Sequence, residues 1–595
     1  MRELEYPFDG DYIIMKKKAL RRELLKKEKL LPLRIAVLGG YTTDDIVKVL
    51  ELFLLNSGIK PAFYESEYNR YYEDAMFENG ELEAFKPEII FICTSVRNIT
   101  DFPDINDSAE TVENKFKTEC ERLEAMWERL DRVYGCPVIQ NNYEYPSERL
   151  LGNRDSWDIH GAVNFTLRLN AFIGEYASSH GKFYVHDVNY LSSLYGLEKW
   201  SDPFYWHMYK YAVSVPAIPR FAFNLSNIIK SLMGKNRKVL MLDLDNTLWG
   251  GVIGDDGEDN IEIGQETSLG QTYSEFQKYI KSLSSLGILL AINSKNDEET
   301  ALKGLRRPDT VLSPEDFAVK RINWEPKSEN LISAAEELSL LPESFVFVDD
   351  NPAEREIVRA NNKGTAVPEI GDRPEYYKDI IDRSGFFEIT ELSEDDLKRK
   401  SMYKANAERR ESLTQFTDYG EYLRSLDMKG EIGDFIPAYM SRIAQLTNKS
   451  NQFNLTTKRY TQNEIEEAER EDDTITIYGK LSDRFGDNGV VSVVIGRIRD
   501  QECHIELWIM SCRVLKRDME FAMMDELVKK CTERKVSTIF GYYYPTAKNA
   551  MVKEFYALQG FEKISEDEDG NTVWRFDIKE DYAKKNRYID VCSGV

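Results

Sequence analysis

Residues 239–249 read Val-Leu-Met-Leu-Asp-Leu-Asp-Asn-Thr-Leu-Trp, and they indicate the architecture around them. The apolar first half predicts a buried strand, and Asp243 and Asp245 follow where that strand ends. Because side chains alternate along an extended chain, these two carboxylates point to the same side. Crowded carboxylates repel each other unless a hard cation lies between them, and Mg²⁺ is the usual one. The pair supplies one aspartate for in-line attack on phosphorus and another for acid/base work.

Three later segments complete this pattern. Gly287-Ile-Leu-Leu-Ala-Ile-Asn-Ser294 predicts a second apolar strand, which ends in a hydroxyl. Trp324-Glu-Pro-Lys327 places a cation just before a helical pattern, and Ser344-Phe-Val-Phe-Val-Asp349-Asp350 predicts a third strand that ends in two acids. Short apolar runs separated by helical segments indicate a parallel α/β sheet, whose ligands bind at the carboxyl ends of the strands.

The order and spacing of these segments resemble the haloacid dehalogenase (HAD) phosphohydrolase superfamily. The resemblance implies Mg²⁺ as the cofactor, with Asp243 as the nucleophile and Asp245 as the acid/base. The implied metal ligands are Asp243, Asp245 (through its carbonyl), Asp349 and Asp350. The implied phosphate-binding groups are Thr247, Ser294 and Lys327. Fewer than fifty residues separate Thr247 from Ser294, which leaves no room for a large cap domain. We therefore expect an open site that suits a macromolecular partner or is covered by another domain.

Bulk properties restrict the class of protein. A chain of 595 residues is too long for one core. A formal net charge of −25 speaks against nucleic-acid binding, which needs concentrated Lys and Arg. No apolar stretch approaches the roughly 20 residues of a membrane span, and no apolar signal segment is present at the N-terminus. We expect a cytoplasmic protein that binds neither nucleic acid nor membrane.

The patterns predict an α/β protein of three domains. The first begins with a basic helical pattern from Met15 to Leu31, followed by a buried strand at Arg34–Gly40. The second holds the HAD segments in a capless, Rossmann-like parallel sheet, and the third follows an acidic stretch at 391–396. The predicted boundaries are 1–231, 232–385 and 386–595.

Further stretches resemble signature segments of the FkbH-like proteins: Leu38–Thr43, Asn323–Ser328, Leu446–Lys458 and Leu507–Leu515. Characterised members take the glyceryl group of 1,3-bisphosphoglycerate, release phosphate and load the acyl group onto the phosphopantetheine thiol of an acyl carrier protein. The resemblance implies that substrate, or a similar acyl phosphate, and that partner. The HAD pocket would bind the phosphate of the mixed anhydride while the thiol attacks the activated carbonyl.

If the enzyme carries the acyl group itself, it needs a cysteine. Cys512 lies within a signature segment, and the adjacent Arg513 would favour its thiolate. The alternative is a small buried core residue, the commoner role of a free cysteine.

The third domain resembles a GNAT acyltransferase, because Asn549–Phe561 is similar to the helix and strand that close the pantetheine channel of that fold. The turn that would hold the pyrophosphate of acetyl-CoA has Lys516 and Asp518 where glycines would be expected. A Cβ obstructs close approach and Asp518 would repel phosphate, so we do not expect tight binding of acetyl-CoA. The residues expected to meet an acidic carrier protein are Arg513, Lys516 and Arg517.

The first domain resembles a degenerate SGNH hydrolase with a flavodoxin-like α/β fold. Gly40-Tyr41-Thr42 stands where that family has Gly-Asp-Ser, and Asp202 and His207 are five residues apart instead of three. Gln140-Asn141-Asn142 resembles the remnant of an oxyanion segment. We expect no hydrolysis here, and a structural or docking role instead.

Two alternatives to glyceryl loading stay open. A plain Mg²⁺-dependent phosphatase of another phosphorylated substrate would need only the HAD residues. A non-catalytic scaffold that docks a carrier is the other, and the complete set of clustered acids argues against it.

Overall fold

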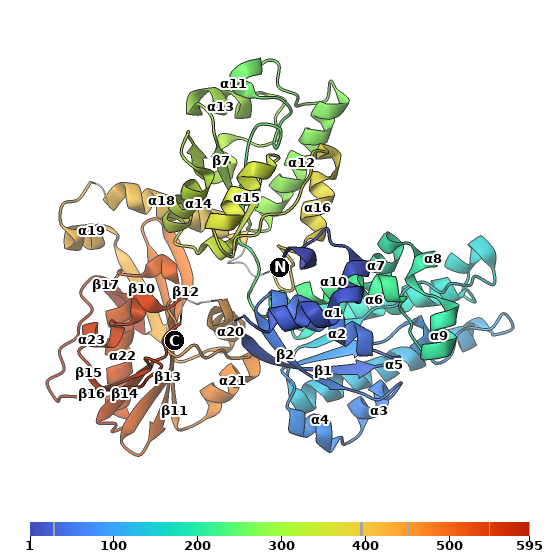
Figure 1. Ribbon diagram of the computed structural model, residues 1–595. Helices are drawn as coiled ribbons and strands as arrows, with labels where there is room; N and C mark the ends of the chain where they lie inside the picture. The colour runs from blue at the N-terminus through green and yellow to red at the C-terminus, as the bar shows by residue number, and fades with distance from the viewer. Residues whose placement is uncertain (28–29, 393–396, 414, 450–451, 547, 594–595) are drawn as a thin grey trace. The chain divides into compact units, whose positions relative to one another are not determined.

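The computed structural model describes residues 1–27, 30–392, 397–413, 415–449, 452–546 and 548–593 (Figure 1). They form two compact units: Met1–Leu232 with Arg383–Thr390, and Met233–Asp382 with Glu391–Val595. The first unit contains one sheet and the second contains two. The predicted domain boundaries themselves stay a prediction. Within the described ranges, every helix is too short or too polar to cross a membrane.

The first unit is built on a five-stranded parallel sheet of order β2-β1-β3-β4-β5, a flavodoxin-like arrangement. Alternate residues of β1, such as Ala36 and Leu38, pack on α5 and α6, while α1, α2 and α10 pack together on the other side (Figure 1). The elements are β1 (Leu31–Gly39), β2 (Ile59–Glu65), β3 (Ile89–Cys93), β4 (Val138–Asn141), β5 (Phe183–His186), α1 (Gly10–Leu24), α2 (Asp44–Asn56), α3 (Tyr71–Met76), α4 (Gly80–Phe85), α5 (Ala109–Tyr134), α6 (Ala162–Ser179), α7 (Val188–Tyr195), α8 (Leu197–Trp200), α9 (Pro203–Tyr209) and α10 (Ile218–Leu232).

The predicted extent of the first helix is wrong. α1 ends at Leu24, and Leu31 already pairs with Ile59 as the first residue of β1. Pro32 does not break the strand, because β1 pairs with β3 only from Ile35 onward and the missing N–H of Pro32 faces no partner there.

The four-stranded sheet of the second unit is wholly parallel, with the order β8-β7-β6-β9. Asp243 directly follows β6, an inner strand whose carboxyl end lies between those of β7 and β9. The elements are β6 (Val239–Leu242), β7 (Leu289–Ser294), β8 (Phe317–Ile322), β9 (Phe345–Val348), α11 (Ile253–Asp256), α12 (Ser268–Ser285), α13 (Glu298–Leu305), α14 (Lys327–Glu337), α15 (Pro352–Asn361) and α16 (Tyr377–Arg383).

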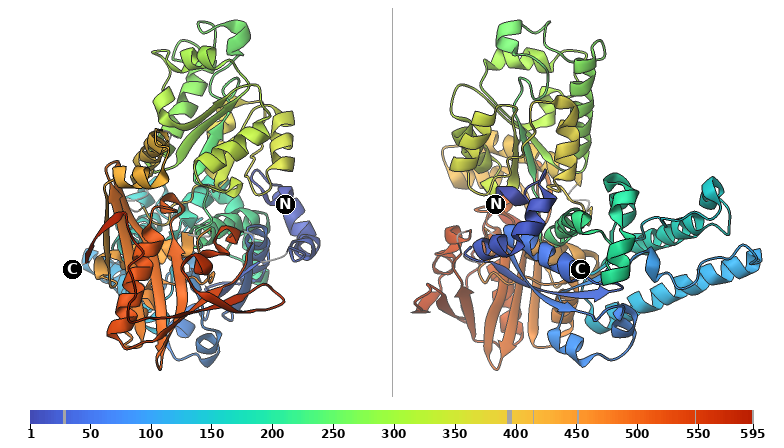
Figure 2. Two further views of the ribbon diagram at one scale, coloured as in Figure 1. Left: turned by 90° about the vertical axis from the view of Figure 1, so that its left-hand side faces the viewer. Right: turned by 45° about the vertical axis from the view of Figure 1, so that its right-hand side comes forward.

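The C-terminal part of the second unit is an eight-stranded mixed sheet of order β15-β16-β14-β13-β12-β11-β10-β17. Its strands run side by side in the orange and red region of Figure 2. α22 packs on its core, contributing Met523 and Leu527. The elements are β10 (Met428–Gly433), β11 (Thr474–Asp483), β12 (Gly486–Arg499), β13 (Glu502–Met510), β14 (Thr538–Tyr543), β15 (Glu562–Glu566), β16 (Thr572–Asp577), β17 (Ile589–Ser593), α18 (Arg399–Leu413), α19 (Tyr419–Ser425), α20 (Met440–Lys449), α21 (Gln462–Arg470), α22 (Met519–Glu533) and α23 (Phe555–Leu558).

Candidate active site

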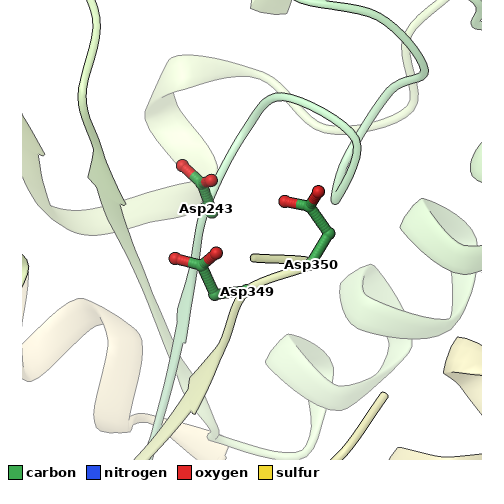
Figure 3. Close-up of side chains that lie close together, drawn as sticks. All are labelled: Asp243, Asp349 and Asp350. Carbon is green, nitrogen blue, oxygen red and sulfur yellow. The ribbon is translucent and has the colours of Figure 1, made fainter. Parts of the chain in front are cut away.

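Two adjacent strand ends bring three carboxylates together. Asp243 follows β6, and Asp349 and Asp350 follow the neighbouring β9. One oxygen of each lies within 4.8 Å of the others, and Figure 3 shows the three side chains turned toward one small space. Oδ1 of Asp243 is buried and accepts no hydrogen bond from the described residues. A buried carboxylate oxygen without a partner is costly unless a cation compensates it, so this oxygen-only set fits Mg²⁺.

A buried lysine lies against the same carboxylates. Lys327 is the first residue of α14, and its Nζ is 2.9 Å from Oδ2 of Asp243 and 2.6 Å from Oδ2 of Asp349. Burial alone would lower the pKa of Lys327, but the two negative charges outweigh it and raise that pKa. The ammonium group therefore stays charged and can also bind a phosphoryl oxygen.

The acids themselves are made less acidic by this environment. Burial, followed by the charge of Asp243, raises the pKa of Asp349 to about 7 in the metal-free chain. The same two causes raise the pKa of Asp350. A divalent cation at the cluster would oppose both shifts, because it favours the charged carboxylates.

Asp245 is held in a fixed orientation by three donors. Its Oδ1 accepts from the indole N–H of Trp249 (2.9 Å) and the backbone N–H of Ile253 (3.1 Å), and its Oδ2 accepts from Asn296 (2.9 Å). Burial raises the pKa of Asp245, and the charge of Asp243 adds to this effect. An oriented carboxyl group with a raised pKa suits a general acid/base.

The two predicted phosphate-binding hydroxyls are almost fully buried. Thr247 Oγ1 accepts the backbone N–H of Asp350 at 3.2 Å, which ties the loop after β6 to the loop after β9. Ser294 Oγ accepts from the Asn296 side chain at 3.3 Å. Both hydroxyls act as acceptors in these contacts, so each can still donate its own hydrogen.

Two residues of the site escaped the sequence analysis. Asn296 contacts both Asp245 and Ser294, and its position two residues beyond Ser294 was a usable signal for a shared face. Arg355 in α15 donates to the backbone carbonyls of Asp349 (2.8 Å) and Asp350 (2.7 Å) and so fixes their loop. No local pattern marks Arg355, because its partners in the site are backbone atoms.

The three residues predicted to meet a carrier differ in how exposed they are in the structure. Lys516 is exposed and Arg513 is half-buried, whereas the side chain of Arg517 is 11% exposed and pairs with the buried Asp483. Asp483 also receives two hydrogen bonds from Arg409, at 2.7 and 2.8 Å. Arg517 therefore belongs to a buried ion-pair cluster and not to a surface patch. The side chain of Cys512 lies outside the described part of the structure, as do Ser450 and Asn451 of the predicted signature segment.

The residues that resemble an SGNH site do not form a hydrolytic pair. Asp202 caps α9 by accepting the N–H of Phe204 at 2.8 Å, and His207 is exposed on the same helix. Tyr41 is buried, and its hydroxyl oxygen accepts from the Cys93 thiol at 3.1 Å. Asn141 is fully buried and contacts His186, a residue that the sequence analysis did not single out.

Comparisons with known proteins found similarity to one family model and to solved structures. A family model described as the FkbH N-terminal domain matches residues 34–230. The N-terminal part of the protein BF1531 from Bacteroides fragilis, which contains a phosphatase domain complexed with Mg, is 27% identical with a TM-score of 0.58. That match covers 63% of this chain and 99% of the other. The ribosomal-protein-S18-alanine N-acetyltransferase from Escherichia coli is 13% identical with a TM-score of 0.20, covering 27% of this chain and 99% of its own. No curated protein matches.

The parallel sheet, its acid cluster and the likeness to a Mg-bound phosphatase domain define a phosphatase-like enzyme of the HAD type. More narrowly, residues 34–230 match the N-terminal domain of FkbH, so this part of the chain is similar to the FkbH-like proteins.

Proposed function

We propose that this protein uses Mg²⁺ to take the glyceryl group of 1,3-bisphosphoglycerate, release phosphate and load an acyl carrier protein as a thioester. The observation that supports phosphate chemistry is the cluster of Asp243, Asp349 and Asp350 around the charged Lys327. The glyceryl donor and the carrier rest on the resemblance to the FkbH-like proteins.

The residues at the strand ends suit the cleavage of a phosphoester. Lys327 holds a phosphoryl oxygen while Asp243 attacks phosphorus, and Asp245 gives a proton to the departing oxygen. Asp245 then removes a proton from the water that hydrolyses the aspartyl phosphate. Asp243, Asp349 and Asp350 would hold Mg²⁺, which would supply positive charge that offsets the phosphoryl oxygens.

Two phosphates must leave for a glyceryl thioester to form. At C1, the carrier thiolate forms a C–S bond as the C–O bond to the acyl phosphate breaks, and the thiol proton goes to solvent. At C3, one water cleaves the phosphomonoester by the aspartate chemistry described above. Neither step needs an oxidant or a reductant. Cys512 is an alternative first acceptor of the acyl group, in which case the carrier thiol would attack an enzyme-bound thioester.

Intact-mass spectrometry tests this proposal. The protein is mixed with Mg²⁺, freshly generated 1,3-bisphosphoglycerate and a phosphopantetheinylated carrier. A glyceryl adduct is expected on the carrier. With Asp243→Asn, a carrier adduct that forms should keep its C3 phosphate, because the phosphoester cleavage is lost. Glu258→Gln removes an exposed carboxylate of the same sheet domain and is the matched control that should behave as wild type.

Each outcome separates the candidate functions. An adduct on this chain that Cys512→Ala abolishes would assign the intermediate to Cys512. Release of phosphate without a mass gain on either protein would refute acyl loading and favour the plain phosphatase. Absence of both, with Mg²⁺ present, would contradict the phosphatase chemistry as well.

A further inference from the structure

The C-terminal sheet contains a gap between two parallel strands. β13 and β14 pair only through Glu502–His504 and Thr538–Phe540. Beyond that point β13 continues for six residues and β14 for three, without pairing to each other. Unpaired strand edges expose N–H and C=O groups that attract an extended, amide-bearing chain. Pantetheine, with its two amides, is such a chain, and coenzyme A is the cofactor that the GNAT-like resemblance implies.

A segment of the protein itself lies in this gap. The N–H of Leu455 donates to the carbonyl of Trp508 (3.2 Å), and the N–H of Met510 donates to the carbonyl of Phe453 (3.1 Å). On the other edge, the N–H of Tyr544 donates to the carbonyl of Leu455 (2.9 Å). Residues 453–455 therefore bond to β13 and to the residue that follows β14, as an inserted strand would.

Side chains fix this segment in place. Phe453, Asn454 and Leu455 are each at most 4% exposed, and Phe453 packs edge-on against Phe555 with ring centres 5.0 Å apart. The fully buried Asn549 donates to the carbonyls of Asn454 and Tyr544, both at 2.9 Å. Asn549 opens the stretch that resembles the wall of a pantetheine channel, so that wall is bonded to the chain's own strand.

The turn before α22 is also engaged in hydrogen bonds within the protein itself. Lys516 and Asp518 adopt left-handed φ angles of 62° and 69°, the conformation for which glycine would be expected. The N–H of Lys516 donates to a carboxylate oxygen of Glu520 at 2.7 Å. The Asp518 carboxylate accepts from the N–H groups of Arg587 (2.6 Å) and Tyr588 (3.2 Å). Glu520 thus takes one backbone N–H group that a pyrophosphate would need, and Asp518 places a second carboxylate in the same turn.

From these two observations we infer that the GNAT-like domain does not bind coenzyme A, because residues 453–455 and the carboxylates of Asp518 and Glu520 replace it. The residues present do not fit the cofactor that the fold implies. The same strand excludes the pantetheine arm of a carrier from this gap. This inference goes beyond the proposed function, and it stands whether or not a carrier is loaded at the HAD site.

Calorimetry with the full-length protein tests the inference directly. Titration with coenzyme A should give no saturable heat up to about 1 mM ligand, a range that detects even weak complexes. Glu520→Gln removes one of the charges that would repel pyrophosphate, yet it should also fail to bind because the inserted strand remains. Saturable binding by either protein would overturn the inference.

Hydrogen exchange supplies a second readout on the same unmodified chain. The N–H groups of Leu455, Met510 and Tyr544 should exchange slowly, and addition of 1 mM coenzyme A should not change their rates. Faster exchange at these three positions on addition of the ligand would mean that coenzyme A displaces the strand. That result would turn the segment into a movable lid and would overturn the proposal.

Discussion

Single residues decide the electrostatics of the candidate site. Lys327 compensates two buried carboxylates at once, so loss of its charge would leave Asp243 and Asp349 without a counter-ion. Breaking a buried ion pair from one side costs about 3–5 kcal/mol. The negative charge of the acid cluster is therefore balanced by Lys327 alone before metal binds, and by Lys327 together with a divalent cation afterwards. This explains how the carboxylates can be assembled before metal binds.

His186 gives the first unit a dependence on pH. Its ring is fully buried between Phe91 and Phe221, its Nδ1 is 2.8 Å from Oδ1 of Asn141, and burial lowers the pKa of His186 to about 3. The unfolded chain has the ordinary pKa of 6.5, so between these values the unfolded state binds the extra proton. The stabilisation is present above pH 6.5 and is lost as the pH falls toward 3.

We predict that His186→Gln weakens this pH dependence. Wild type should lose free energy of unfolding relative to the variant by up to about 1.4 kcal/mol per pH unit below pH 6. Exchange of β5 amides in urea at pH 7, 6 and 5 measures the loss in this unit alone. His207→Gln, at an exposed position, is the control, and equal slopes for wild type and His186→Gln would contradict the assignment.

At the scale of elements, the inserted strand depends on one buried side chain. We predict that Asn549→Ala destabilises the C-terminal sheet by about 2–4 kcal/mol, because the carbonyl of Asn454 loses its donor in a buried site and that of Tyr544 loses its donor in a partly buried one. Urea unfolding of the full chain, followed by exchange of β13 and β14 amides, measures the change. The exposed Asn361, which donates to the Ile357 carbonyl of its own helix, gives the control Asn361→Ala. A loss no larger than that of the control would refute this role.

Elements with a strong local pattern could be predicted from the sequence, and the others could not. β6, β7 and β9 are continuous apolar runs, and the structure confirms the parallel α/β sheet that they indicate. β8 was not predicted, because its burial alternates as expected for an edge strand. β5 was not predicted either, because the two middle residues of its four are only half-buried. The residues of the candidate site also divide into those that a strong local pattern predicts and those that no local pattern reveals. Asp243 and Asp349 follow strong strands, but the partner of Arg517, Asp483, is 34 residues away and no local pattern reveals it.

At the scale of the whole molecule, the first unit is not a continuous piece of chain. Residues 383–390 return to it after the HAD-like sheet is complete. Lys230 Nζ donates to the carbonyl of Gly385 (2.9 Å), and Ser231 Oγ donates to that of Glu388 (3.1 Å). The last turn of α10 therefore gains hydrogen-bond partners from this returning segment.

We predict that a fragment ending at residue 383 has a less stable first unit than one ending at 392. The loss of these hydrogen bonds and the packing around them should lower the Tm of that unit by about 2–6 °C. Thermal unfolding of both fragments, with exchange of β1 and β3 amides to identify the unit, measures the difference. Equal Tm values would show that the returning segment contributes nothing.

This discontinuity has a consequence for synthesis on the ribosome. After Leu232 has been made, about 160 further residues must be added before Thr390 exists. At 5–20 residues per second, the interval is roughly 8–30 s. During that time the parallel sheet of the first unit can form, but the end of α10 waits for partners that have not yet been translated. The HAD-like sheet, encoded entirely within the interval, can reach its folded form before the unit that flanks it is complete.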